Sequence, residues 1–336
     1  MKAAVFYEKE KIVVEEVPVQ EPGDYEVRIR VKAAGVCGTD MHIFAGAQGA
    51  TQCEPPVILG HEFSGIVEKT GAKVTKVKVG DHVTVDPNIS CGSCYQCRKG
   101  APHYCENMVA TGVNFNGGFA EYCTVLEKQV FILPEDMPFE AGAMCEPLAC
   151  CLHGIDLAEI QPGDGVVIIG AGTIGLILLQ LAKLSGAARV AVLEPMEERQ
   201  KMALEIGADL AIDSIHSDPR EELDKADFGS VDVVIECVGR KDSMAMAIDI
   251  AGKGGTAVLF GVADPDCEIP FSPYKAFQKE LTVRSSFVNP MTQGRAVRLL
   301  SGGRLNILPL ISDRISIDNI EEAFTKRHAG KVVIIP

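Results

Sequence analysis

The chain has 336 residues, of which 47% are hydrophobic and 23% charged, with a formal net charge of −14 and a pI near 5. This excess of acidic residues argues against nucleic acid or anionic lipid as a partner, because both require clustered Lys and Arg. The length predicts two domains, since single hydrophobic cores rarely grow beyond about 250–300 residues.

The first sixteen residues lack the apolar core of a signal peptide, which predicts a cytoplasmic protein. Residues 165–182 carry no charge, but glycines within this stretch favour a strand that turns into a helix over a membrane span. We therefore expect no membrane partner. In a reducing compartment, clusters among the twelve cysteines are first interpreted as metal ligands.

Three regions differ in their predicted elements. Residues 1–135 contain short alternating strands separated by Gly, Pro and Asp turns, as in a β-barrel or sandwich. From about residue 164, apolar strands alternate with helical segments, which predicts a parallel sheet covered on both faces. Residues 288–336 are too few for a core of their own and should pack on the first region. The predicted domains are thus 1–148 with 288–336, and 149–287.

A group of possible metal ligands is scattered through the first region. Cys37, His61, Glu62 and Glu146 together offer sulfur, nitrogen and oxygen donors, and such mixed sets leave a position open for water or substrate. Zinc at this site would lower the pKa of an alcohol. Each residue alone also has an ordinary structural explanation, such as a small core thiol or a solvated strand end.

Four cysteines lie within one short segment, about 88–108. Their spacing matches a closed tetrahedral zinc site that stabilises a lobe without a hydrophobic core. An iron–sulfur cluster is the main alternative, although the bacterial ferredoxin spacing differs. His103 is a further candidate ligand. The predicted structural ligands are Cys91, Cys94, Cys97 and Cys105.

A glycine-rich loop follows the apolar strand at 166–169 and precedes a helix, which is the setting of a dinucleotide-binding fingerprint. The helix N-terminus would receive the pyrophosphate. Glu194 ends the next strand, where an acid can accept hydrogen bonds from ribose hydroxyls and repel a 2′-phosphate. This favours NAD over NADP, and Arg199 weakens that preference. The loop residues expected to contact the coenzyme are Gly170, Gly172, Thr173, Ile174 and Gly175.

Together these motifs resemble the zinc-dependent medium-chain alcohol and polyol dehydrogenases, and most of all the sorbitol and polyol dehydrogenase branch. The motifs occur in the family's order over essentially the whole chain: GVCGTDMH, GHEFSGIVEKTGAKV, VGDHV, the four-cysteine segment, GGFAEY, EPLA and the glycine loop. The resemblance implies an α/β protein with a GroES-like β-barrel catalytic domain and an inserted Rossmann domain, a doubly wound parallel sheet. The active site would lie in the cleft.

The resemblance also implies roles for single residues. Cys37 and His61 correspond to the constant zinc ligands, Thr39 to the hydroxyl that takes the alcohol proton, and His42 to the histidine that passes it on. Glu146 stands where many alcohol dehydrogenases have a third cysteine ligand. In the polyol branch, that glutamate and the equivalent of Glu62 lie at or beside the catalytic zinc.

The resemblance further implies the activity. We expect reversible oxidation of a secondary hydroxyl of a polyol to a ketone, with NAD as hydride acceptor, two zinc ions per chain, and a homodimer or homotetramer. L-threonine, butanediol or an aldose are alternative substrates. A zinc-ribbon protein that senses nucleotides is the alternative from another class, and it would bind one zinc. Ile43, Phe44 and Phe287 are the candidates for the substrate-facing wall.

Overall fold

The computed structural model describes residues 1–47 and 53–336, and these form two compact units. The first unit contains Met1–Ala149 and Pro290–Pro336, and the second contains Cys150–Asn289. These bounds lie within two residues of the predicted domain bounds. Among the described residues, no helix has the length and apolar character to cross a membrane.

The first unit is built around two sheets. One has the strand order β2-β1-β4, and the other has the order β10-β6-β5-β3-β18-β17, with β9 pairing β3. The tail enters the second of these sheets through β18, which pairs antiparallel with β3 and parallel with β17. The strands are β1 (Lys2–Glu8), β2 (Lys11–Glu16), β3 (Glu26–Gly35), β4 (Val57–Ile58), β5 (Glu62–Thr70), β6 (His82–Val85), β9 (Tyr122–Leu126), β10 (Val130–Ile132), β17 (Ile311–Ser316) and β18 (Lys331–Ile335).

Strand β3 shows why this region forms a barrel-like core. Val27, Ile29 and Val31 are buried, whereas Arg28 and Arg30 between them are more exposed, so one face of the strand points inward. These valines and isoleucine join the hydrophobic core of the first unit. The helices of this unit are α1 (Gly38–Phe44), α2 (Tyr95–Arg98), α3 (Phe139–Ala143), α10 (Gln293–Ser301) and α11 (Glu321–Thr325).

The segment with the four cysteines is a small lobe. It lies between β7 (Asn88–Ile89) and β8 (Val109–Ala110), which pair with each other as a two-stranded sheet. Helix α2 has no buried residue, and Cys105 is the one buried residue between residues 91 and 108. The lobe therefore has no hydrophobic core to stabilise it.

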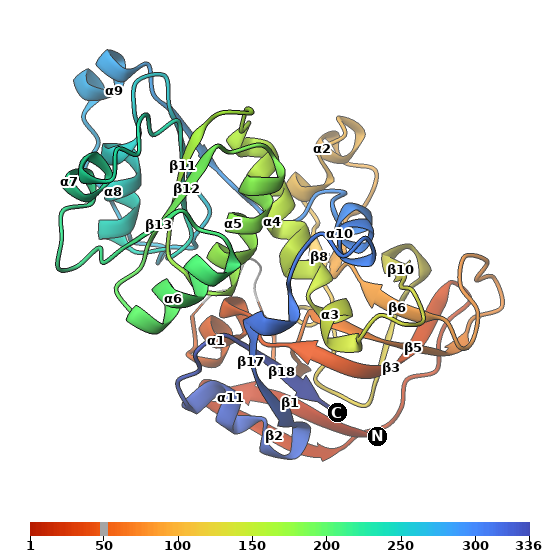
Figure 1. Ribbon diagram of the computed structural model, residues 1–336. Coiled ribbons are helices and arrows are strands. Elements are labelled where there is room, and N and C mark those ends of the chain that lie inside the picture. The colour runs from red at the N-terminus through yellow and green to blue at the C-terminus, as the bar shows by residue number, and fades with distance from the viewer. Residues whose placement is uncertain (48–52) are drawn as a thin grey trace. The chain divides into compact units, whose positions relative to one another are not determined.

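The second unit is a six-stranded parallel sheet with the order β13-β12-β11-β14-β15-β16. All five residues of β11 are buried, as expected for a strand with helices on both faces. Figure 1 shows α5 and α6 on one side of the strands, and α7 and α8 on the other. The strands are β11 (Gly165–Ile169), β12 (Arg189–Leu193), β13 (Leu210–Ile212), β14 (Val233–Glu236), β15 (Thr256–Leu259) and β16 (Thr282–Ser285). The helices are α5 (Thr173–Leu184), α6 (Glu197–Ile206), α7 (Pro219–Lys225), α8 (Lys241–Ile250) and α9 (Pro273–Lys279), and α4 (Cys145–Ala158) runs from the first unit into the second.

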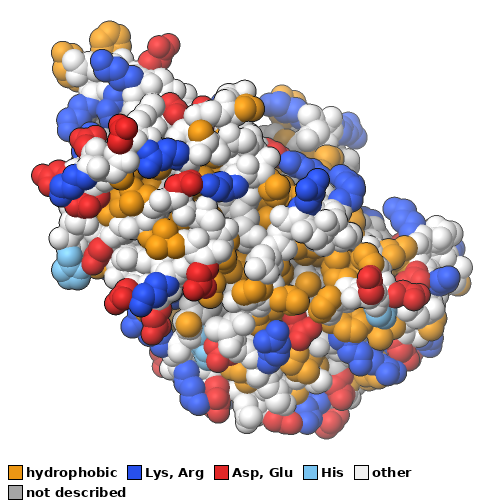
Figure 2. All heavy atoms as spheres, viewed as in Figure 1, with side chains coloured by type: hydrophobic (Ala, Val, Ile, Leu, Met, Phe, Trp, Pro, Cys, Tyr) orange, Lys and Arg blue, Asp and Glu red, His pale blue; other side chains and the backbone are white. Residues whose placement is uncertain are grey.

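The surface agrees with the mixed composition of the chain. On the face drawn in Figure 2, Lys and Arg side chains are interspersed with Asp and Glu rather than gathered into one patch.

Candidate active site

Cys37 and Asp40 are held together at the start of α1. Cys37 occupies the N-cap position, and its backbone N–H donates to Asp40 Oδ2 over 2.9 Å. Asp40 is fully buried, and its Oδ1 lies 3.4 Å from His61 Nδ1. The carboxylate of Asp40 thus holds the backbone of Cys37 through one oxygen and lies beside the ring of His61 with the other.

His61 is placed by the glycine that precedes it. Gly60 has a φ of +92°, a backbone conformation that other residues rarely adopt, and a Cβ there would lie 2.7 Å from the ring of Phe119. The tight turn brings His61 to the start of β5, next to Glu62. The turn therefore requires glycine both for its conformation and for its space.

Cys37, His61 and Glu62 form a group in which the potential ligand atoms all lie within 4.8 Å of one another. Burial alone would lower the pKa of His61, but the negative charges of Asp40 and Cys37 outweigh it and raise that pKa well above its ordinary value. Anionic neighbours of this kind suit a site for a divalent cation. The sulfur, nitrogen and oxygen donors fit zinc.

Lys331 is a buried member of this cluster that the sequence motifs did not predict. Its Nζ lies 2.8 Å from Glu62 Oε1 and 2.5 Å from Glu62 Oε2, and it donates to the carbonyl oxygen of Val36 over 3.0 Å. Burial would lower the pKa of Lys331, but Glu62 and Cys37 raise it overall. The signal was present in the sequence, because a lysine that begins an otherwise apolar strand needs a buried partner.

Glu146 lies in the first turn of α4 and is buried. It is not a member of the group of three potential ligands formed by Cys37, His61 and Glu62. Its negative charge nevertheless contributes to the raised pKa of Lys331, so Glu146 belongs to the same charged surroundings. Direct ligation by Glu62 or by Glu146 stays a prediction.

Thr39 and His42 lie three residues apart on α1, so their side chains share one face of the helix. Thr39 is half-buried, whereas His42 is exposed. This order, from a partly buried hydroxyl to an exposed imidazole, is the one that a proton path to solvent requires.

The four lobe cysteines also form one group, with all four sulfur atoms within 4.8 Å of one another. Cys94 Sγ lies 3.9 Å from Cys105 Sγ, close to the edge of about 3.8 Å expected for sulfurs around one tetrahedral zinc. Backbone N–H groups of Ser93 and Cys94 lower the pKa of Cys91 to about 5. Burial and the neighbouring thiols raise the pKa of Cys97 to about 11.

This compactness separates the two metal alternatives for the lobe. An iron–sulfur cluster places several irons and inorganic sulfides between its cysteines, which needs wider spacing. His103 is not a member of the four-residue group; its ring lies 3.9 Å from the ring of Tyr104, measured between centroids. The four cysteines therefore fit a single zinc ion.

The glycine loop of the second unit joins β11 to α5. Gly170 has a φ of +102°, and a Cβ at Gly175 would lie 1.9 Å from the Gly170 carbonyl oxygen. A Cβ at Gly172 would meet no atom within 4 Å, so the space beside this glycine is open to a ligand. Thr173 and Ile174 begin the helix and are half-buried. The loop fits the pyrophosphate of a dinucleotide at a helix N-terminus.

Glu194 is buried at the end of β12, and both of its carboxylate oxygens accept backbone hydrogen bonds. Oε2 accepts from Ala171 N over 2.9 Å, and Oε1 accepts from Met196 N over 3.0 Å. Arg199 Nη1 lies 4.0 Å from Glu194 Oε2. Glu194 thus holds the glycine loop, and its contact with the coenzyme ribose stays a prediction.

The three residues predicted to face the substrate differ in their burial. Ile43 is 3% and Phe44 7% exposed, and both belong to the core of the first unit, where the ring of Phe44 lies 4.8 Å from that of Phe324. Packing therefore explains both side chains without a substrate. Phe287 is 37% exposed in the second unit. For all three, contact with substrate stays a prediction.

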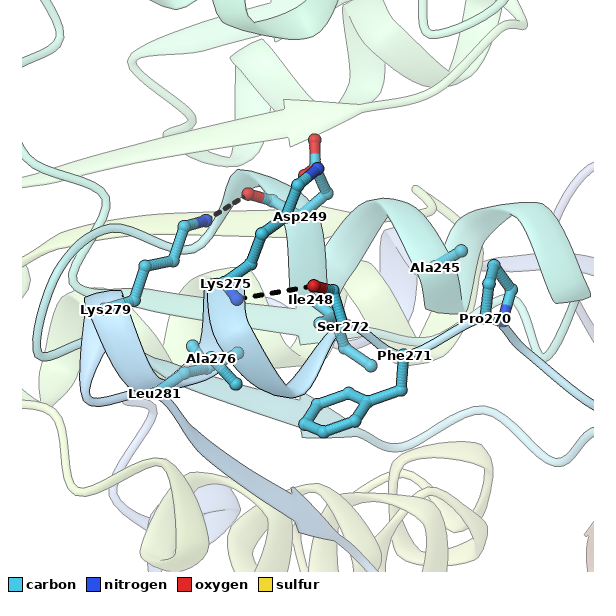
Figure 3. Close-up of a pocket in the computed structure, with 10 residues that line it drawn as sticks. All are labelled: Ala245, Ile248, Asp249, Pro270, Phe271, Ser272, Lys275, Ala276, Lys279 and Leu281. Carbon is cyan, nitrogen blue, oxygen red and sulfur yellow. Dashed lines mark hydrogen bonds and ion pairs between the residues drawn. The ribbon is translucent and has the colours of Figure 1, made fainter.

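A pocket of about 330 Å³ in the second unit involves none of the predicted site residues. Figure 3 shows it between α8 and α9, with Ile248, Phe271, Lys275 and Lys279 among its walls. The C-terminal end of α8 and the start of β16 lie at the amino edge of the sheet, whereas the glycine loop follows the carboxyl end of β11. The pocket is therefore separate from the nucleotide site.

Comparison with known proteins identifies the family of both parts of the chain. The family described as alcohol dehydrogenase GroES-like domain matches residues 23–135, and the family described as zinc-binding dehydrogenase matches residues 173–301. The chain is 37% identical to L-threonine 3-dehydrogenase of Pyrococcus furiosus, with 94% of this chain and 92% of that protein covered. It is 34% identical to D-arabinitol dehydrogenase 1 of Uromyces fabae, with 99% and 97% covered.

A solved structure shows the same fold throughout. It is a zinc-binding dehydrogenase of Sinorhizobium meliloti bound to NADP, with a TM-score of 0.95, 39% identity, and coverage of 100% of this chain and 99% of that one. These likenesses extend over both units and exclude a zinc-ribbon binding protein. Taken with the zinc-compatible groups and the glycine loop, they show that the chain belongs to the zinc-dependent medium-chain alcohol and polyol dehydrogenases, enzymes that use zinc and a nicotinamide coenzyme on small-molecule substrates.

Proposed function

We propose that the protein oxidises a secondary hydroxyl of a polyol or vicinal diol to a ketone, reversibly, with NAD as hydride acceptor. The observation that carries this proposal is the oxygen-rich donor set: Glu62 lies with Cys37 and His61, and Glu146 is buried in the same charged surroundings. Carboxylate oxygens are harder ligands than thiolates, and they suit a metal that exchanges ligands to accept two neighbouring hydroxyls. The similarity to a D-arabinitol dehydrogenase supports the same substrate class.

The chain's own residues account for the proton. Zinc supplies a Lewis acid that lowers the pKa of an alcohol, and the nicotinamide ring accepts the hydride. The Thr39 hydroxyl accepts the proton of the substrate hydroxyl as it gives up its own, and the exposed His42 releases a proton to solvent at the end of the path. A hydroxyl alone is a poor base near neutral pH, so the path needs a group such as histidine at its end.

L-threonine is the second candidate substrate. The similarity to L-threonine 3-dehydrogenase of Pyrococcus furiosus supports it, and threonine also carries a secondary hydroxyl. Threonine differs from a polyol in its ammonium and carboxylate groups, which need charged partners. The deciding experiment measures NADH formation with polyols, vicinal diols, L-threonine and aldoses. Turnover of polyols or diols well above that of threonine is expected, and the opposite order would replace the proposal by the threonine reaction.

The donor set itself is testable through zinc content. We expect Glu62→Ala and Glu146→Ala to lower the catalytic zinc content and to reduce polyol turnover by at least about tenfold, since each removes a buried anionic donor near the metal. Zinc analysis with activity assays would show this, and Glu205→Ala on the exposed face of α6 is the control. Full zinc content and full activity in both variants would refute the role of the carboxylates.

We also propose that the enzyme is a cytoplasmic homodimer or homotetramer that prefers NAD. Among the described residues, the outer strand β16 pairs only with β15, and its Val283 is 40% exposed. An uncovered edge strand is a natural place for a second copy to pair. The buried Glu194 supports NAD over NADP, although the Sinorhizobium relative binds NADP.

A further inference from the structure

Glu236, the last residue of β14, is a fully buried carboxylate to which no motif gave a role. Its Oε1 accepts three hydrogen bonds: from Val238 N and Gly239 N, each over 2.8 Å, and from Ser243 Oγ over 2.7 Å. The donors belong to the loop after β14 and to the first turn of α8. One carboxylate oxygen therefore ties the whole loop to the end of the strand.

This loop stands at the point of the sheet where a dinucleotide binds. Strands β11, β12 and β13 follow one another toward one edge of the sheet, and β14, β15 and β16 follow one another toward the other edge. In such sheets the ligand lies beyond the carboxyl ends of the two central strands. Ile169 at the end of β11 pairs directly with Glu236 at the end of β14.

The loop after β14 packs directly against the glycine loop. A Cβ at Gly170 would lie 2.8 Å from Val238 Cγ2. Cys237 Sγ donates to the Ile169 carbonyl oxygen over 3.1 Å. In a sheet of this topology the crevice for the ligand lies beside these two loops, so the glycine loop and the segment from Cys237 to Gly239 are its two walls.

The glycine loop is likewise fixed by a buried carboxylate. Glu194 directly follows β12, on the other side of β11, and accepts a hydrogen bond from Ala171 N of the glycine loop. Two buried carboxylates at the ends of the strands that flank β11 therefore each fix one loop. Glu194 fixes the glycine loop, and Glu236 fixes the loop on the other wall.

The second oxygen of Glu236 argues against a role in stability alone. Oε2 is buried and accepts no hydrogen bond from the described residues, which is a costly state for a carboxylate. A Cβ at Gly261 would lie 2.8 Å from this oxygen and 2.2 Å from Gly239 N, so the carboxylate and the loop have little room to shift toward β15. An apolar side chain would avoid that cost but could not hold the loop.

We propose that Glu236 is a positioning residue for the nicotinamide coenzyme: it fixes the wall of the crevice that faces the glycine loop and does not itself touch coenzyme or substrate. This inference rests on the coenzyme site of the proposed function, but it does not depend on which alcohol is oxidised.

The test is the dissociation constant of NADH, measured by fluorescence titration well below the melting temperature, together with the melting temperature of the coenzyme-free protein. Glu236→Gln keeps an acceptor but removes the charge, and NADH binding should weaken about tenfold, as expected when a charge-assisted hydrogen bond becomes neutral. Ser243→Ala removes one donor and leaves the carboxylate in place, so a smaller change in the same direction is expected. Glu205→Gln is the matched control, because it is exposed near the C-terminal end of α6, at the amino edge of the sheet.

Each outcome has one meaning. Weaker NADH binding by Glu236→Gln and Ser243→Ala, with the control unchanged, supports the positioning role. A lower melting temperature with an unchanged dissociation constant would show a purely structural role and overturn the inference. If Glu236→Gln does not fold, Ser243→Ala decides alone by the same criterion. Failure of the unmodified enzyme to bind NADH would instead contradict the coenzyme assignment of the proposed function.

Discussion

The buried ion pair between Lys331 and Glu62 includes one of the candidate zinc ligands, Glu62. Both side chains are almost completely buried, at 7% and 1% exposed. Burying two charges is unfavourable unless each satisfies the other. The pair therefore supports the geometry of the site only while both partners are present.

Removal of one partner should be strongly destabilising. In the protein without catalytic zinc, Lys331→Met leaves Glu62 as an unpaired buried charge, and we expect a loss of about 3–5 kcal/mol in the free energy of unfolding. Denaturant unfolding measures this loss. Lys326→Met, which breaks an exposed pair with Glu322, should cost at most about 1 kcal/mol. In the double variant with Glu62→Gln, part of the stability should return, and strict additivity would contradict the coupling.

The charge of Glu194 also bears on the choice between NAD and NADP. With Glu194 beside the ribose, as proposed, Glu194→Gln removes a negative charge that would repel a 2′-phosphate, and it leaves Arg199 without its anionic neighbour at 4.0 Å. We expect the ratio of kcat/KM for NADP to that for NAD to rise by about tenfold. Using the ratio cancels any loss caused by the weakened hold on Ala171. Glu197→Gln on the exposed surface is the control, and an unchanged ratio in Glu194→Gln would refute the ribose role.

Sequence motifs predicted groups whose members are near in the chain, and the scattered group of possible metal ligands was predicted from the types of its donor atoms and from the resemblance. The cysteine spacing and the glycine loop are local patterns, so they predict their own geometry. Lys331 lies 269 positions from Glu62, and no local pattern connects the two. Glu236 was missed for a different reason, because its donors are mainly backbone N–H groups, which carry no side-chain signature.

Among the structural elements, the cysteine lobe depends most on metal. Its strands β7 and β8 have two residues each, and its helix α2 buries no side chain. Metal binding must therefore supply the stability that packing does not.

We expect Cys94→Ala to lose one zinc per chain and about 3 kcal/mol or more of stability, since loss of a structural metal is among the largest single effects. Zinc analysis with thermal unfolding tests this. Cys267→Ala, outside the lobe, is the control, and its zinc content should not change. A melting temperature of Cys94→Ala equal to that of the unmodified enzyme would count against the structural zinc.

Strands were predictable from the sequence where apolar residues follow a regular pattern. The alternation in β3 and the continuous burial of β11 follow directly from apolar periodicity. The two-residue strands β7 and β8 were not predictable, because such short pairs form through their neighbours rather than through their own propensity.

For the whole molecule, the open edge of the parallel sheet predicts how copies associate. We expect Val283→Lys to shift the enzyme toward monomer, because a charge at each of two facing edges would repel its counterpart. Light scattering after size-exclusion chromatography measures the mass. Val262→Lys, at an exposed loop position of the same unit, should leave the mass unchanged. An unaltered assembly in Val283→Lys would place the contact between copies elsewhere.

The division of the chain into two units has a consequence for biosynthesis. The nucleotide unit is one continuous segment, Cys150–Asn289, whereas the first unit needs β18, which follows that segment in the chain. During translation the parallel sheet can therefore form while the barrel still lacks both a strand and the lysine that neutralises Glu62. Until β18 is made, the N-terminal segment has an incomplete sheet and Glu62 has no lysine partner. We therefore expect ribosome-associated chaperones to bind this first segment more than the nucleotide unit.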